Sequence, residues 1–211
     1  NRNETEGKMK EKRTQREWIL GINAVFLILL VVIMYPVFET NDDLTIMEMV
    51  SGAWNIQDAH VVYQNYLLGK LYVLLYSLTK CVPWYGLIQY VFLWMAFSAI
   101  VYVIMKRLPK EFSLTLSVLV LCFFGYECYI EMQYTKTAGV LTIAGILLIF
   151  QECTAEIRSK KLLISGIVLS CIGSMYRFEQ FVACVALMSG LGIFQILKGR
   201  KKDIFKQVGR S

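Results

Sequence analysis

Two adjacent carboxylates near the start of the chain are the residues best suited to chemistry. Asp42 and Asp43 lie in the acidic stretch 39–48, directly after the uncharged apolar run 18–38. Adjacent carboxylates where a chain leaves a membrane suit metal binding, proton abstraction or recognition of a hydroxyl-rich substrate. They equally suit a solvated turn with a helix N-cap, because Asn and Asp are favoured at helix starts. These residues alone leave both interpretations open.

Other ionisable residues flank later apolar runs and could act with this pair. Glu127 and Glu131 form a second acidic segment, Lys136 and Arg177 lie at the ends of apolar runs, and Lys70 interrupts another. An enzyme that uses a lipid-phosphate sugar donor needs such a set. A carboxylate deprotonates the acceptor hydroxyl, and cations or a divalent metal stabilise the departing phosphate.

The composition indicates a membrane protein. Of 211 residues, 56% are hydrophobic and the mean hydropathy is +0.51, whereas soluble domains average roughly 45–50% apolar residues. The apolar residues come in blocks separated by charges, which is typical of a polytopic membrane protein. The net charge of +6 can be assigned to cytoplasmic loops. We therefore expect membrane lipids as partners and no nucleic acid.

The apolar blocks predict an all-α membrane helix bundle with six spans, because about 20 apolar residues at about 1.5 Å each cross about 30 Å. The predicted spans are residues 18–38, 84–105, 112–126, 137–150, 162–176 and 181–197. Residues 61–80 are also apolar, but Gln64, Asn65 and Lys70 interrupt them. They predict an interfacial or re-entrant helix in the first extracytoplasmic loop.

The distribution of basic residues sets the predicted orientation. If residues 61–80 do not cross, all but four of the 22 Lys and Arg residues fall on the inner side, as the positive-inside rule requires. A crossing there would flip every later loop and remove the bias. We expect a multi-pass plasma-membrane protein with both termini cytoplasmic. The predicted organisation is a basic leader 1–17, a transmembrane domain 18–197 with first outer loop 39–83, and a basic tail 198–211.

Short spans bring charge close to the membrane core. Residues 162–176 would make a helix of about 22 Å, shorter than a bilayer core. Arg177 and Lys136 would then lie at membrane depth, where a charge usually pairs or lines a polar cavity. The alternative is that both side chains reach the outer headgroups.

The order of these features resembles the GT-C superfamily of integral membrane glycosyltransferases. Those proteins have a first span and then a long extracytoplasmic loop that opens with an acidic pair and contains helices lying along the membrane. The segments that carry the likeness are Asn41-Asp42-Asp43, Ser51-Gly52, residues 65–69, Pro83-Trp84-Tyr85, residues 133–138 and Tyr176-Arg177. They are similar to bacterial membrane proteins of this type. GT-C enzymes usually have more spans, so we expect this chain to be an N-terminal part.

The resemblance implies transfer of a sugar from a polyprenyl-phosphate donor to an acceptor at the extracytoplasmic face. Asp42 or Asp43 would be the catalytic base or would bind a divalent cation, Mg²⁺ or Mn²⁺, and Glu131 or Glu127 would assist. The residues implied to contact the donor are Lys70, Glu127, Lys136 and Arg177.

Two other functions fit the sequence. A transporter, flippase or polysaccharide polymerase would place ionisable residues near the middle of the membrane, whereas here they gather at one face, which favours the enzyme. A non-catalytic membrane subunit would tolerate Asp42→Asn and Asp43→Asn. The enzyme hypothesis requires that the ionisable residues meet in one wet pocket on the outer face. Those residues are Asp42, Asp43, Glu131, Lys136 and Arg177.

Overall fold

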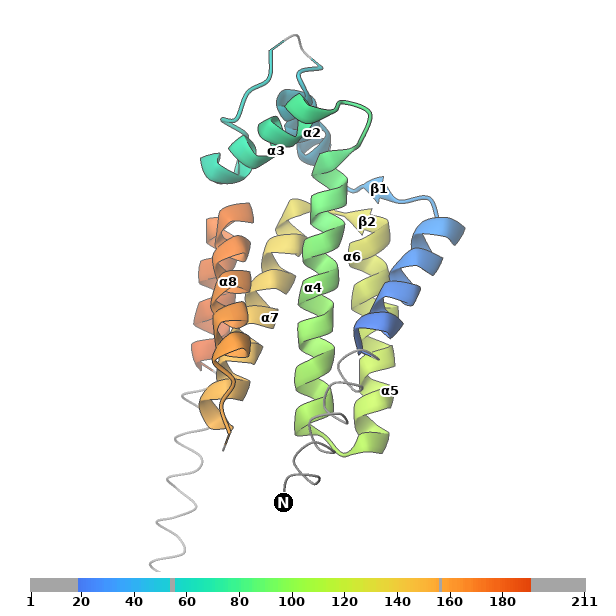
Figure 1. Cartoon of the computed structure of the whole chain (residues 1–211), viewed down its shortest axis with the longest axis vertical. Helices are drawn as coiled ribbons and strands as arrows, with labels where there is room; N and C mark the ends of the chain where they lie inside the picture. The colour runs from blue at the N-terminus through green and yellow to red at the C-terminus, as the bar shows by residue number, and fades with distance from the viewer. Residues whose placement is uncertain (1–18, 54–55, 156, 191–211) are drawn as a thin grey trace, which may run out of the picture.

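The helices of this protein form a bundle that is capped at one end. The computed structural model describes residues 19–53, 56–155 and 157–190. Several helices run along the long axis (Figure 1). They are Ile19–Ile33, α4 (Trp84–Arg107), α5 (Lys110–Val120) continued by η1 (Leu121–Gly125) and α6 (Tyr126–Ile130), α7 (Tyr134–Thr154), α8 (Lys160–Tyr176) and Phe178–Gly190. Two shorter helices, α2 (Asn41–Ser51) and α3 (Tyr66–Leu78), lie across one end.

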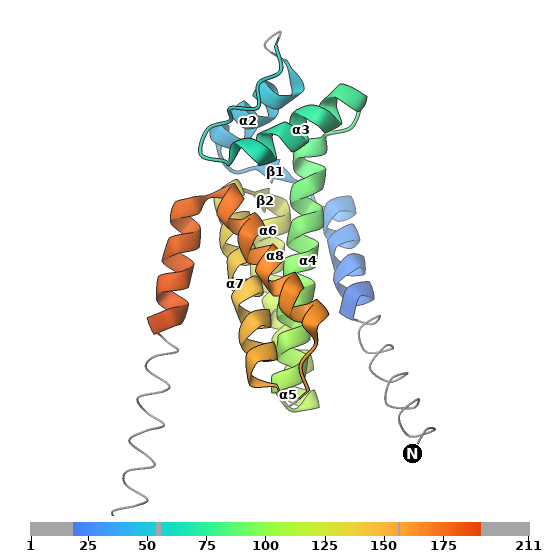
Figure 2. The same ribbon diagram turned by 60° about the vertical axis from the view of Figure 1, so that its left-hand side comes forward.

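Three of these helices are long and apolar enough to cross a membrane. They are Trp84–Arg107, Lys110–Ile130 and Tyr134–Thr154, with mean hydropathies of 2.1, 1.7 and 1.6. The helices Ile19–Ile33 and Phe178–Gly190 are apolar but shorter within the described residues. They flank the bundle on opposite sides (Figure 2). The predicted leader, the tail and residues 191–197 of the last predicted span lie outside the described part of the chain.

Some helix ends differ from the sequence prediction. The helix predicted to end at Tyr126 continues to Ile130 through the π-helical turn η1, since no Gly or Pro after Gly125 interrupts it. Within the apolar stretch 61–80, the helix begins only at Tyr66. There the Asn65 side chain accepts a hydrogen bond from the Leu67 amide at 2.9 Å, as expected of an N-cap.

Small residues allow α7 and α8 to pack closely. A β-carbon on Gly173 would lie 2.5 Å from Thr142 Oγ1 and 2.9 Å from the Ala138 carbonyl oxygen. A β-carbon on Gly166 would lie 2.9 Å from the Gly145 carbonyl oxygen. Close backbone contact at small residues is a common way for membrane helices to associate. This contact fixes the end of α8 beside the start of α7.

A buried polar network holds the first helix against the bundle. Asn23 is fully buried, and its amide donates to the Trp94 carbonyl at 2.9 Å and to Ser98 Oγ at 2.8 Å. Its side-chain oxygen accepts from the Tyr129 hydroxyl at 3.0 Å. The helix Ile19–Ile33 is therefore joined to both α4 and α6 by hydrogen bonds rather than by apolar contact alone.

A short parallel β-bridge brings the segment after the first helix to the start of α7. Strand β1 (Val37–Phe38) pairs with β2 (Glu131–Met132), and the Glu39 amide donates to the Met132 carbonyl at 3.0 Å. Since α2 begins two residues after Glu39 and α7 begins two residues after Met132, this bridge places the two helix N-termini next to each other.

Candidate functional site

The buried carboxylate of Asp43 is where α2, α4 and α7 meet. Asp43 has no exposed surface, and its Oδ1 accepts hydrogen bonds from the Tyr85 hydroxyl at 2.7 Å and the Tyr134 amide at 3.1 Å. Gln89 Nε2 lies 3.4 Å from the same oxygen, and the Thr40 hydroxyl donates to Oδ2 at 2.8 Å. The first turn of a helix favours a carboxylate because of the helix dipole. Each oxygen of Asp43 thus already has a protein donor.

Burial changes the acidity of this carboxyl group. Loss of hydration raises the pKa of Asp43, and the hydrogen bonds from Tyr85, Thr40, Gln89 and Tyr134 only partly lower it again. The network continues outward, since Gln64 Nε2 donates to the Tyr85 hydroxyl at 3.1 Å. Asp43 therefore holds the helices together at this end of the bundle, and its oxygens are not accessible to a bound molecule.

Asp42 is the exposed member of the pair. Its Oδ2 accepts a hydrogen bond from the Tyr134 hydroxyl at 3.4 Å. The same hydroxyl oxygen accepts from Arg177 Nη1, also at 3.4 Å, and Arg177 Nη1 donates to Thr135 Oγ1 at 2.7 Å. One tyrosine hydroxyl thus joins a carboxylate and a guanidinium that lie 135 positions apart in the sequence. We call Asp42, Tyr134 and Arg177 the outer triad.

Two tyrosine rings surround the Arg177 guanidinium. Its Cζ lies 5.5 Å from the Tyr63 ring centroid and 5.6 Å from the Tyr134 ring centroid, within the range of cation–π attraction. Glu179 Oε2 lies 3.8 Å from Arg177 Nε, but the Glu179 side chain is 77% exposed, so solvent screens that ion pair. The Arg177 side chain is about one third exposed and can meet an anion from outside.

A second charged cluster surrounds Lys136. Its Nζ lies 2.6 Å from both Glu39 Oε2 and Glu127 Oε1, and 3.9 Å from Glu131 Oε2. It also donates to the Glu131 carbonyl at 3.3 Å. We call these four residues the Lys136 cluster. It links the segment after the first helix to α6 and α7 beside the β-bridge.

Neither the aspartate pair nor the three glutamates around Lys136 offer a divalent cation a free set of carboxylate oxygens. The oxygens of Asp43 face hydroxyl and N–H donors, so Asp42 and Asp43 do not present a pair of free carboxylates. The oxygens of the three glutamates lie within 4.8 Å of one another, but the Lys136 ammonium is already among them. A metal ion there would have to displace the ammonium.

The structure divides the predicted site residues into two groups at the same end of the bundle. Asp42 and Asp43 belong with Arg177, whereas Glu127 and Glu131 belong with Lys136. Lys70 lies apart, with its Nζ 4.8 Å from the Tyr66 ring centroid. The sequence did not indicate Tyr63 as a site residue, and Tyr85 and Tyr134 were present only within the motifs Pro83-Trp84-Tyr85 and 133–138. Nothing in the sequence marks Tyr63, whose contribution comes from its backbone conformation.

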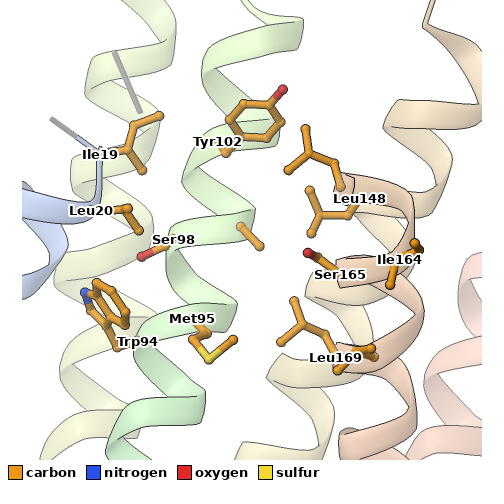
Figure 3. Close-up of a pocket in the computed structure, with 13 residues that line it drawn as sticks. Ile19, Leu20, Trp94, Met95, Ser98, Tyr102, Leu148, Ile164, Ser165 and Leu169 are labelled. Carbon is orange, nitrogen blue, oxygen red and sulfur yellow. The ribbon is translucent and has the colours of Figure 1, made fainter. Parts of the chain in front are cut away.

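A cavity away from this end has a different character. It has a volume of about 430 Å³ and lies between the first helix, α4, α7 and α8 (Figure 3). Its walls are mostly apolar, with Ser98 and Ser165 on facing sides. None of the predicted site residues lines it, so it is separate from the outer triad.

Comparisons of the chain with protein-family models, with curated proteins and with solved structures found no match.

Proposed function

We propose that this protein is a membrane glycosyltransferase of the GT-C type. It would transfer a sugar from a polyprenyl-phosphate donor to an acceptor hydroxyl at the extracytoplasmic face. The observation that carries the proposal is the outer triad, in which one hydroxyl joins an exposed carboxylate to a partly exposed guanidinium. The first loop supports it too, because α2 and α3 lie across the end of the bundle and the acidic pair opens α2 (Figures 1 and 2).

The reaction needs a base and an anion-binding group. In the proposed step, Asp42 takes the proton from the acceptor hydroxyl, and the acceptor oxygen forms a bond to the anomeric carbon of the donor sugar. The bond between that carbon and the phosphate oxygen breaks, and its electron pair leaves with the polyprenyl phosphate. Arg177 stabilises the charge that develops on this leaving group. The N-terminus of α7 adds a favourable dipole on the same side.

The two aspartates have different roles in this proposal. A general base must come within hydrogen-bond reach of the proton it removes, and exposed Asp42 satisfies this condition. Asp43 is a positioning residue, because it binds α2 to Tyr85 of α4 and to the Tyr134 amide of α7. The proposed step uses no divalent cation, because hydrogen-bond donors already occupy the carboxylate oxygens of Asp43.

The remaining predicted residues are not needed for the step. The charge of Lys136 is offset by Glu39 and Glu127 at 2.6 Å, so Arg177 is the better phosphate contact. The roles predicted for Lys70, Glu127 and Glu131 stay predictions. The Lys136 cluster supports the site indirectly, by holding the segment before α2 beside α7.

The proposed topology keeps six spans with α3 at the outer interface. The helix Ile19–Ile33, α8 and Phe178–Gly190 run beside the three long apolar helices (Figure 2), which supports their crossing as well. The turns between α4 and α5 and between α7 and α8 carry basic residues and lie at the end opposite α2 (Figure 1). The positive-inside rule makes that opposite end cytoplasmic. Exposed leucines form a stripe along α3, at positions 67, 71, 74 and 78, which suits the membrane surface.

The proposal is tested by measuring sugar transfer from polyprenyl-phosphate donors with the full-length protein in lipid. We expect Asp42→Asn to lower kcat about 100-fold or more, as for loss of a general base. Its thermal unfolding should stay near wild type because Asp42 is exposed. Asp58→Asn, an exposed carboxylate of the same loop, is the matched control and should keep full activity. Unchanged transfer in Asp42→Asn would remove this residue as the base.

A further inference from the structure

The backbone of Tyr63 adopts an unusual conformation beside the outer triad. Its φ is +64°, and among the described residues no other non-glycine residue has a positive φ. A residue with a β-carbon rarely adopts this left-handed conformation, and it persists only where the surrounding structure holds it. Strain of this kind is often found where a side chain must be aimed at a ligand.

The residues that follow Tyr63 hold it in this conformation. Gln64 is buried and donates to the Tyr85 hydroxyl at 3.1 Å, and that hydroxyl donates in turn to Asp43. The main-chain amide of Asn65 donates to the Met175 carbonyl at 2.8 Å. The chain is therefore anchored to α4 and α8 immediately after Tyr63, and the ring direction is set by these anchors.

The Tyr63 ring lies against Tyr134 and beside Arg177. The two tyrosine rings are parallel within 6°, with centroids 6.0 Å apart, and the Arg177 guanidinium carbon lies 5.5 Å from the Tyr63 centroid. Tyr63 nevertheless remains 57% exposed. It thus offers an aromatic surface to solvent next to the group that would bind a phosphate.

We propose that the Tyr63 ring contacts the donor saccharide next to the outer triad. The C–H face of the sugar packs on this ring while the donor phosphate binds Arg177. This inference rests on the proposed function. An aromatic face carries partial negative charge and attracts the partial positive charge of C–H groups. The ring and the guanidinium lie side by side, as the sugar and phosphate of one donor molecule do.

A simpler explanation is that Tyr63 only anchors the loop in the lipid headgroups, as tyrosines at membrane surfaces often do. Tyr66 allows the two explanations to be separated. It is 41% exposed, lies three residues away, and stacks on His60 with centroids 4.6 Å apart. As the first residue of α3, it makes no described contact with Arg177, which makes it a matched control.

The test compares two kinds of ligand in the full-length protein in lipid nanodiscs. The probes are undecaprenyl phosphate and the same lipid phosphate bearing glucose, galactose, mannose or N-acetylglucosamine. We expect wild type to bind at least one sugar-bearing lipid more tightly than the sugar-free one. Tyr63→Ala should weaken that binding up to about tenfold, the effect of losing one aromatic contact, and leave the sugar-free lipid within about twofold. Tyr63→Phe and Tyr66→Ala should bind both as wild type does.

A second variant separates misfolding from loss of contact. Tyr63→Gly removes the ring and relieves the backbone strain, since glycine readily adopts positive φ. It should unfold at or above the wild-type temperature and show the same selective loss as Tyr63→Ala.

Several results would overturn the inference. An equal loss for both lipids would mean that Tyr63 acts only through Arg177, and a similar loss in Tyr66→Ala would mean membrane anchoring. Wild type that gains nothing from any of the four sugars would exclude the saccharide contact. The proposed function fails on a different result: no sugar transfer, or full transfer by Asp42→Asn, even where a sugar-dependent gain in binding is seen.

Discussion

The Tyr85 hydroxyl donates a 2.7 Å hydrogen bond to the buried Asp43 carboxylate, and this contact fixes α2 on top of α4. Asp43 also binds the Tyr134 amide, so three helices depend on one side chain. In the acidic pair, Asp43 is therefore a buried structural carboxylate, whereas Asp42 is exposed. The proposed catalytic role of Asp42 and the structural role of Asp43 can be tested separately by substituting the two residues individually.

Replacing Asp43 is expected to destabilise the protein. In Asp43→Asn the amide nitrogen replaces an oxygen that accepts from Tyr85 and Tyr134 or from Thr40, leaving a buried donor unpaired. We expect a loss of about 1–3 kcal/mol in the free energy of unfolding, measured by thermal or denaturant unfolding in detergent. Asp58→Asn, at an exposed position, should unfold as wild type does. A normally stable Asp43→Asn that has lost transfer would instead make Asp43 a catalytic residue.

The pH dependence of stability tests the burial of Asp43. Its pKa is raised above the ordinary value of 3.8, chiefly because burial disfavours the charged form. The folded state then binds this proton more tightly than the unfolded chain. The contribution to stability is full below the unfolded pKa and is lost as pH rises through the folded pKa. The stability of wild type relative to Asp43→Asn should therefore increase as pH falls from about 7 to about 4. A relative stability that decreases over this range would mean that the hydrogen bonds outweigh burial.

Removing the charge of Lys136 should leave three carboxylates facing one another. In Lys136→Gln, Glu39, Glu127 and Glu131 repel without a cation among them. We expect a loss of about 1 kcal/mol or less, because these side chains are partly exposed and surface ion pairs contribute little. Raising the salt concentration should shrink the loss by screening. Lys80→Gln, which removes the charge of an exposed lysine outside this cluster, is the control. A loss that is equal at low and high salt would point to packing rather than charge.

A change at the contact between α7 and α8 should affect the site from a distance. In Gly173→Ala the new methyl group would lie 2.5 Å from Thr142 Oγ1, so α8 must move away from α7. Arg177 follows the last residue of α8 and should be displaced from Tyr134. We expect weaker binding of undecaprenyl phosphate, by about tenfold for the loss of one charged contact. Ser174→Ala, the neighbouring position, should bind normally. Unchanged binding in Gly173→Ala would show that Arg177 is held independently of the helix.

The hydrophobic blocks of the sequence were sufficient to predict a mostly helical chain with apolar helices long enough to cross a membrane. Three of the predicted spans coincide with helices long enough to cross a membrane, and Asn65 caps the helix predicted in the first loop. The spans could be predicted because the length of an apolar block is a local property of the chain, whereas the cap at Asn65 was found only in the structure. The helix ends near Glu127 and Tyr134 were less accurate, because the π-helical turn and the β-bridge depend on contacts between distant segments.

The separate environments of Asp42 and Asp43 could not be predicted from the sequence. Neighbouring residues on a helix point about 100° apart, and which one is buried depends on how α2 packs against α4 and α7. The pairing of Lys136 with Glu39 likewise requires the β-bridge. The position of Tyr63 requires a left-handed backbone that Gln64 and Asn65 hold in place. A tyrosine gives no sequence signal for such a conformation.

Tyr134 binds Asp43 through its main-chain amide and Asp42 through its hydroxyl. These two contacts of Tyr134 together constrain the rotation of α2 about its own axis and the distance of α2 from α7. Inserting a single residue before Asp42 would rotate the residues that follow by about 100° about the helix axis, so Asp43 would leave its buried position beside Tyr85 and the Tyr134 amide. Both contacts with Tyr134 would then change together, so the chain length between the β-bridge and Asp43 must be kept.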